Sequence, residues 1–192
     1  LYGLMVANLP SVNSLASIYF FLQRPLMYAR LAQLRDELGG FDAFPLIPQT
    51  YYPNHYTMIV TPEFPLVVKV GHAHAGYGKM KINGVTEFQD FRSLCSLHND
   101  YVTAEPFIEW DYDIRIQKIG QNYRAFKRIS SNWKGNVGNA SINEDMEMTE
   151  QFKTWIDECS TFFGGLDICA LDAVHSKKDG KYYILELNDT GI

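Results

Sequence analysis

Apolar residues recur at helical spacing in several stretches, which predicts helices over residues 14–23, 25–38, 86–98 and 148–163. In the second stretch Met27, Leu31 and Leu34 lie three or four residues apart, so one face of that helix is expected to be buried. Pro25 suits the first turn of this helix, and the glycine pair at 39–40 suits its end.

Short apolar runs and alternating runs, separated by turn residues, predict strands at 1–9, 44–47, 66–70, 79–82, 101–108, 112–119, 123–129, 166–174 and 181–187. The run at 112–119 alternates apolar and polar residues, which is typical of a strand with one face in the core. The segment 49–62 contains prolines and mixed polar residues, so we expect a loop between two lobes. This mixture of helices and strands indicates an α+β fold.

A lysine interrupts one apolar strand immediately before a glycine-rich loop. Lys69 lies in the strand at 66–70, and because an unpaired ammonium is costly to bury, we expect an anion beside it. Gly76 and Gly78 permit backbone angles that turn successive N–H groups toward a phosphate, and Lys79 adds a second cation. The stretch therefore predicts a flap over a nucleotide polyphosphate, with an ordinary hairpin and mobile loop as the alternative.

Two familiar phosphate-binding motifs do not fit this loop. Tyr77 stands where a Walker A loop requires lysine, and Met80 stands where it requires serine or threonine. Residues 79–82 resume as a strand, whereas a dinucleotide fingerprint continues as a helix. We interpret His74 as a loop donor near phosphate, because no third metal ligand is nearby in the sequence.

Pro106 interrupts the predicted strand at 101–108. Because proline lacks a ladder donor, the strand is expected to end, bulge or bend there. Such a break would leave backbone groups of residues 105–108 for the edge of an adenine, and an ordinary strand end is the alternative.

Two acids fall on the strands of the last predicted hairpin. Asp172 and Glu186 each interrupt apolar surroundings, and like charges on adjacent strands repel unless a cation lies between them. Oxygen ligands suit Mg²⁺ or Ca²⁺, and Asn188 supplies one more oxygen. The alternative is a pair of solvated strand acids.

Composition narrows the class of protein. The net charge of −5 argues against a general nucleic-acid binder, and no apolar run is long enough to span a membrane. The three cysteines have no ligand-like spacing, so we expect reduced thiols in the core.

The order of lysine strand, glycine flap, interrupted strand and acidic hairpin resembles the ATP-grasp family, whose metal-binding Glu-x-Asn is matched by residues 186–188. Longer motifs resemble the central C domain of synapsins, and they span 52–55, 67–79, 103–108, 112–115, 117–123, 132–134 and 163–170. The resemblance implies two α+β lobes with the nucleotide between them. It also implies that residues 1–60 end a preceding αβ domain and linker, and that 61–192 form an ATP-grasp domain whose carboxyl end is missing.

Together with the chemistry above, the resemblance implies nucleotide contacts from Arg24, Lys69, His74, Gly76, Tyr77, Gly78, Lys79, Glu105, Pro106, Phe107, Ile108, Arg115 and Lys134. It implies metal ligation by Asp172, Glu186 and Asn188, and no catalytic residue. Arg24 stands where vertebrate synapsins have lysine. The position of Asp172 is tied to calcium dependence in the family, so its acid predicts calcium-assisted ATP binding. Asn188 resembles the catalytic enzymes more than vertebrate synapsins, which suggests an invertebrate member.

The resemblance further implies a cytoplasmic, presynaptic phosphoprotein on synaptic vesicles that regulates neurotransmitter release. Its expected partners are ATP, the vesicle phospholipid surface, actin, and further copies of itself in a dimer or tetramer. One alternative is an ATP-grasp ligase that joins a carboxylate to a nucleophile through an acyl phosphate, with Asp113, Arg115 and Arg128 serving the reaction. Another is a structural actin- or membrane-binding module. The sequence does not decide whether ATP is turned over.

Overall fold

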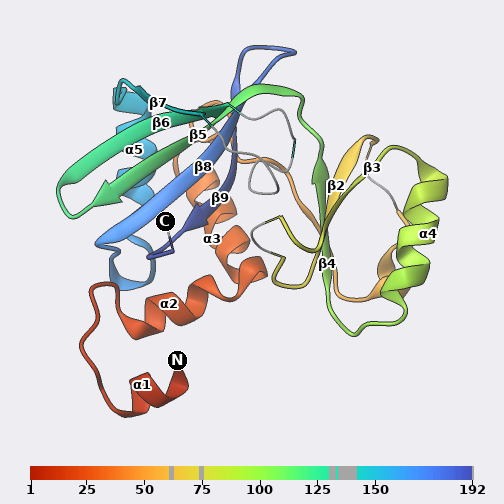
Figure 1. Cartoon of the computed structure of the whole chain (residues 1–192), viewed down its shortest axis with the longest axis horizontal. Coiled ribbons are helices and arrows are strands. Elements are labelled where there is room, and N and C mark those ends of the chain that lie inside the picture. Colours follow the sequence, from red (N-terminus) through yellow and green to blue (C-terminus); the bar gives the residue numbers. More distant parts are fainter. Residues whose placement is uncertain (61–62, 74–75, 130–132, 134–141, 192) are drawn as a thin grey trace. The chain divides into compact units, whose positions relative to one another are not determined.

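The computed structural model describes residues 1–60, 63–73, 76–129, 133 and 142–191 of the chain (Figure 1). These residues form two compact units. The five-stranded unit contains the described residues within 1–46, 110–131 and 140–192, and the four-stranded unit contains those within 47–109 and 132–139. In the described ranges, no helix has the length and apolar character that crossing a membrane would require.

The sheet of the five-stranded unit is antiparallel, in the order β7-β6-β5-β8-β9. Its strands are β5 (Trp110–Ile119), β6 (Asn122–Ile129), β7 (Ile142–Met146), β8 (Ile168–Ser176) and β9 (Tyr182–Asn188). Its helices are α1 (Tyr2–Val6), α2 (Leu15–Phe21), α3 (Arg24–Glu37), α5 (Glu150–Cys159) and the short 3₁₀ turn η2 (Phe162–Gly164).

Helices α3 and α5 cover one face of this sheet (Figure 1). Leu31 and Leu34 of α3 and Trp155 of α5 share a buried cluster with Ile114 and Leu171 of the sheet. Because side chains alternate along a strand, the intervening residues of β5 and β8 lie on the opposite face, away from these helices. That second face carries the charged residues described below.

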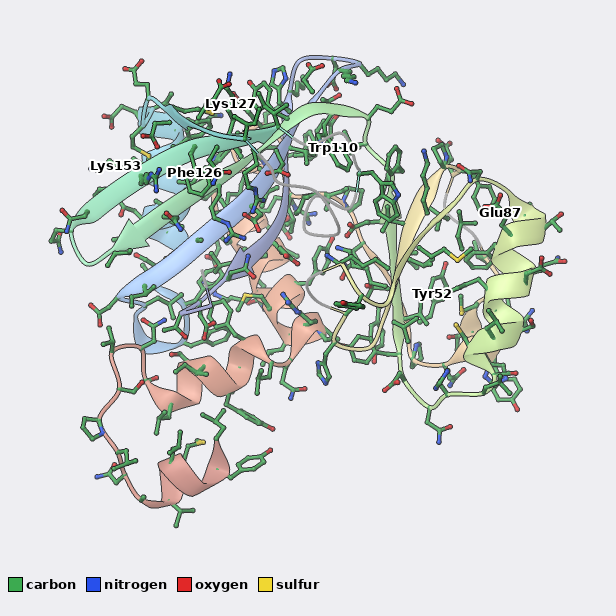
Figure 2. All side chains as sticks on the ribbon, in the orientation of Figure 1. Tyr52, Glu87, Trp110, Phe126, Lys127 and Lys153 are labelled. Carbon is green, nitrogen blue, oxygen red and sulfur yellow. The ribbon has the colours of Figure 1, made fainter. Side chains whose placement is uncertain are left out.

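The four-stranded unit has the sheet order β1-β4-β2-β3, again antiparallel. Its elements are β1 (Thr50–Tyr52), the 3₁₀ turn η1 (His55–Thr57), β2 (Leu66–Val70), β3 (Lys79–Ile82), α4 (Val85–Cys95) and β4 (Val102–Pro106). Helix α4 covers one face, where Phe88 packs with Leu66, Val68 and Ile82. Tyr52 of β1 points toward α4 and meets Phe88 edge to face (Figure 2).

The predicted boundary at residue 60 does not coincide with the division into compact units. The reason is packing: Met27, Leu31 and Phe44 belong to the same core as β5 and β8. Residues 1–46 therefore complete the five-stranded unit. Their assignment to the end of a preceding domain stays a prediction.

Most predicted elements are confirmed, and three are wrong. Residues 1–9 contain the helix α1 instead of a strand. The segment 44–47 makes only an isolated parallel bridge, between Leu46 and Ile184. The expected loop at 49–62 contains β1 and η1, because β1 pairs with β4.

Candidate functional site

Three lysines share the face of the four-stranded sheet that lies away from α4. Lys69 of β2 is directly opposite Lys79 of β3, and Lys81 is two residues further along β3. Residues that are paired or two apart on paired strands point to the same face. The alternate residues Leu66, Val68 and Ile82 fill the core under α4, so the polar face is fixed by the burial of the apolar one.

A glutamate on the same face neutralises Lys69. The Lys69 Nζ lies 2.7 Å from Glu105 Oε1 and 2.8 Å from Glu105 Oε2. The two side chains are only 14% and 7% exposed. Gln49 donates to the same carboxylate over 3.3 Å. The anion that the sequence leads us to expect beside Lys69 is thus present within the protein.

The described residues of the connection between β2 and β3 hold the two strand ends together. Val70 N–H donates to Gly78 O over 2.9 Å, and Ala73 N–H donates to Val70 O over 3.1 Å. Gly78 has φ +67, and a Cβ there would come within 3.2 Å of the Ala73 Cβ. Because an L side chain is strained at this angle, glycine is required for the turn. Tyr77, at the turn, is 77% exposed.

Strand β4 ends at Pro106, as the proline predicts. Phe107 N–H then donates to Pro65 O over 2.9 Å, so this group is already bonded. A base edge at 105–108 would have to use the other backbone groups of the segment. The Lys81 ammonium lies 3.7 Å from the centroid of the Phe107 ring, and Trp133 meets that ring edge to face.

On the five-stranded unit, the predicted acids Asp172 and Glu186 are opposite each other on β8 and β9, which confirms their placement on paired strands. Arg115 is opposite Asp172 on the other side, on β5. Asp113 of β5 is opposite Arg128 of β6. All of these side chains lie on the face away from α3 and α5.

Arginines compensate these acids. Arg115 donates to Asp172 twice, Nε to Oδ1 and Nη2 to Oδ2, each over 2.8 Å. Arg128 donates from Nη2 to Asp172 Oδ1 over 3.3 Å and from Nε to Asp113. Asn188 donates from Nδ2 to Asp172 Oδ2 over 3.1 Å. A carboxylate offers about four lone-pair positions in its plane, and the four hydrogen bonds that Asp172 accepts occupy all of them.

The charges in this network reinforce one another. The pKa of Arg115 is raised, chiefly because its hydrogen bonds to Asp172 favour the charged guanidinium. Burial raises the pKa of Asp113, while Arg128 acts against that increase. Phe126, labelled in Figure 2, lies on β6 opposite Arg115 and is buried.

Glu186 is differently placed from Asp172, although the two are register partners. It lies 3.5 Å from Arg24 Nη1, and its side chain is 28% exposed. Asp189, just beyond β9, has an Oδ2 that is buried with no hydrogen-bond partner among the described residues. Burial raises the pKa of this carboxyl, and the charge of Arg24 acts in the opposite direction.

The contacts above indicate which of the predicted metal ligands could bind a cation. Asp172 does not fit as it stands, because each of its lone pairs already accepts a hydrogen bond from a side chain that would have to leave. Glu186 and the Oδ1 of Asn188 remain suitable oxygen ligands, and the orphaned Asp189 Oδ2 is a third oxygen. Within the described residues, no group of three or more metal-binding side chains is found.

The structure thus brings the predicted residues together in two groups. Lys69, Lys79 and Glu105 lie on one face of the four-stranded sheet. Arg24, Arg115, Asp172, Glu186 and Asn188 gather on the five-stranded unit. His74 and Lys134 lie outside the described residues.

Two candidate site residues were not identified from the sequence. Lys81 was missed although the alternation of Lys79, Met80 and Lys81 signals a shared face for the lysines. Asp189 carried no signal beyond its position next to the Glu-x-Asn motif.

Comparison with known proteins identifies the family. The family described as "Synapsin, ATP binding domain" matches residues 13–192 of the chain. The protein "Synapsin" of Drosophila melanogaster is 42% identical over 194 residues, which cover 98% of this chain. The chain spans 19% of the length of that relative.

Solved structures show the fold. The D-alanine–D-alanine ligase from Bacillus anthracis, complexed with ATP, is 14% identical and has a TM-score of 0.66, over 98% of this chain and 60% of the ligase. The ATP-grasp ligase PsnB, complexed with a minimal precursor, is 19% identical and has a TM-score of 0.62, over 98% of this chain and 57% of its own. The fold is therefore ATP-grasp, and the family match and the Drosophila relative show that the chain belongs to the synapsin family, whose ATP-binding domain it matches.

Proposed function

We propose that the lysine face of the four-stranded sheet contacts the phosphates of ATP. The observation that carries the proposal is the gathering of three lysines on this face, with Lys69 directly opposite Lys79 and Lys81 two residues further along β3. Lysine ammonium groups form charge-assisted hydrogen bonds with phosphate oxygens, and glycine-rich turns such as the one that contains Gly78 can direct backbone N–H groups toward a phosphate. Residues 105–108, with the Phe107 ring, are proposed to contact the base.

On the five-stranded unit, we propose that a divalent cation accompanying the nucleotide binds through Glu186 and the Oδ1 of Asn188. Magnesium in such sites uses one or two carboxylates and keeps phosphate and water ligands, whereas calcium accepts irregular and higher coordination. The sparse protein ligands are of the number that magnesium uses, and calcium is proposed on the family resemblance alone. Arg24 is proposed to contact phosphate when the cation takes its place beside Glu186.

The proposal for the whole protein follows from family membership. We propose a regulatory ATP binder that acts on synaptic vesicles at the presynaptic terminal, contacts their phospholipid surface and actin, and self-associates as a dimer or tetramer. The ligase alternative needs arginines that reach a transferred phosphoryl group. Here Arg115 and Arg128 form ion pairs with Asp172 and Asp113, and each keeps N–H groups beyond these bonds, so the release of phosphate is the measurement that separates binding from turnover.

Calorimetric titration with ATP tests the phosphate assignment. Lys69→Ala alone is a poor test, because it leaves Glu105 buried and uncompensated. The double variant Lys69→Met/Glu105→Gln removes the cation without leaving a charge. We expect it to lower ATP affinity by at least about 10-fold, the usual value of one charge-assisted hydrogen bond.

Glu105→Gln alone is the matched control, since it keeps the lysine. Lys153→Ala, on the exposed side of α5, controls for a general loss of positive charge (Figure 2). If the folded double variant binds ATP as tightly as the unmodified protein, Lys69 is not a phosphate ligand. Titrations with ATP in Ca²⁺, in Mg²⁺ and in EDTA test whether a divalent cation assists ATP binding. Equal ATP affinity in all three would show that it does not. Release of phosphate on prolonged incubation with ATP would favour the ligase.

A further inference from the structure

The carboxylate of Asp172 is the most heavily bonded group on the five-stranded sheet. Its two oxygens accept four hydrogen bonds, from Arg115 twice, from Arg128 and from Asn188. Its side chain is only 8% exposed. Within this network the carboxylate has no lone pair left in its plane for a further ligand.

A metal ion on Asp172 would face two obstacles. It would need a lone pair that a guanidinium or amide now uses, and breaking such a bond leaves a buried donor unsatisfied. It would also enter beside the positive charges of Arg115 and Arg128, which repel a divalent cation at these short distances. The position that the acidic hairpin offers to a cation is therefore the Glu186 side of the strand pair.

The network is balanced in charge. Asp113, Arg128, Asp172 and Arg115 form a continuous chain of ion pairs across β6, β5 and β8, with two acids and two bases. Without Asp172, Arg115 would lose the carboxylate to which it donates twice, and Arg128 would keep Asp113. Asp172 is the member that contacts both arginines, so the orientation of both depends on it.

Each arginine keeps donors beyond these bonds. A guanidinium has five N–H groups, and the contacts of Arg115 and of Arg128 with the carboxylates use two from each. The remaining N–H groups are held in fixed directions, which is the arrangement that recognises phosphate or carboxylate oxygens.

From this arrangement we propose that Asp172 is a positioning residue for Arg115 and Arg128 and does not ligate the divalent cation. Any calcium response of the protein then passes through Glu186. The inference rests on the proposed function only where the experiment uses ATP. It distinguishes two acids that the sequence pattern treats as equivalent.

The first test observes the arginines directly. In protein labelled with ¹⁵N-arginine, the Nε–H of Arg115 should give a signal protected from solvent exchange, and Asp172→Asn should remove that protection. Adding Ca²⁺, alone or with ATP, should leave the signal of the unmodified protein unchanged. If Ca²⁺ releases the Arg115 Nε–H, Asp172 has given its oxygens to the ion and the inference is wrong. The addition of Ca²⁺ to the unmodified protein needs no variant and does not require that ATP binds.

The second test compares ATP affinity in Ca²⁺ and in EDTA by calorimetry. The tighter binding in Ca²⁺ than in EDTA should persist in Asp172→Asn, although it should be weaker, because Asp172 accepts a hydrogen bond from Asn188 and so orients a proposed ligand of the cation. Glu186→Gln should abolish the calcium effect. Asp145→Asn, which breaks the exposed pair with Arg124 on the same sheet, is the matched control.

The outcomes separate the two proposals. A calcium effect that Asp172→Asn abolishes, with Glu186→Gln harmless, overturns the inference and leaves ATP binding intact. Absence of ATP binding in the unmodified protein refutes the proposed function, and the arginine signals still decide the role of Asp172.

Discussion

Breaking the ion pair between Lys69 and Glu105 should destabilise the four-stranded unit more than removing the pair entirely. The perturbation is the set Lys69→Met, Glu105→Gln and the double variant. The pair is well shielded, with 14% and 7% of the side chains exposed and both carboxylate oxygens within 2.8 Å of Nζ. Pairs of this kind behave as buried ones, for which loss of one partner leaves an uncompensated charge.

The magnitudes follow from what each variant leaves behind. Lys69→Met leaves the Glu105 carboxylate with Gln49 as its remaining side-chain donor, so we expect a loss near the lower end of the buried-pair range, about 3 kcal/mol. Glu105→Gln keeps an amide oxygen that Lys69 can still use, so its cost should be about 2 kcal/mol. The double variant leaves no charge and should cost about 1 kcal/mol, less than either single change.

Native-state hydrogen exchange is the suitable assay, because it reports the opening of β2 and β4 separately from the other unit. The exposed pair of Arg124 and Asp145 is the control, and its removal should cost less than about 1 kcal/mol. If the single variants cost no more than this control, or if the double variant costs the sum of the singles, the pair is not a coupled buried one. The reasoning for Lys69 would then be refuted.

Three further predictions concern the five-stranded unit. Asn13→Ala should cost about 2–3 kcal/mol by chemical denaturation, because the buried side chain exchanges two hydrogen bonds with the Ile168 backbone, at 2.7 and 2.9 Å. Burial raises the pKa of Asp157, but hydrogen bonds, chiefly from Lys118, lower it overall. The ionised carboxylate therefore stabilises the folded protein above the unfolded pKa of about 3.9, and this stabilisation is lost as the pH falls through the folded pKa. Asp157→Asn should flatten the acid side of the curve of unfolding free energy against pH. Burial raises the pKa of Cys169 to about 12, so iodoacetamide should label it only after unfolding in urea.

Local patterns were enough to predict the elements that carry their own periodicity. The helix α3 starts at Arg24, with proline in its first turn, and buries Met27, Leu31 and Leu34 as their spacing indicates. Strand β2 spans Leu66–Val70, as its apolar run predicts. The three cysteines are free and buried, as expected from their lack of ligand-like spacing.

The errors arise where pairing between distant segments decides the structure. The first nine residues are apolar, but a short apolar run has no period that separates strand from helix. Strand β1 lies in a segment that reads as a loop, and only its pairing of Tyr51 with Thr103 and Tyr52 with Val102 makes it a strand. The compact units divide the chain after residue 46 for a similar reason, since helix α3 packs on strands more than seventy residues later in the chain, and the predicted domain boundary at residue 60 stays a prediction.

The same limit explains the difference between the predicted and observed surroundings of the charged residues. The sequence shows that Lys69 is a cation in an apolar strand and that Asp172 is an acid in another, and each needs an opposite charge. It does not show which charge, because Glu105 and Arg115 lie 36 and 57 positions away. Reasoning from local sequence therefore assigned both charges to ligands, phosphate for one and metal for the other.

The register of the sheets places the two acids of the last hairpin in different surroundings. Asp172 has Arg115 as its partner on β5, and its four lone pairs are used. Among the described strands, Glu186 is on the last one of the sheet order, β9, which is flanked on its other side by the isolated bridge of Leu46 with Ile184, and its side chain lies 3.5 Å from Arg24 Nη1. A central strand acid gains neighbours on both sides, whereas an edge strand acid gains them on one. For this reason Glu186, and not Asp172, is the acid that we propose as the ligand of a cation.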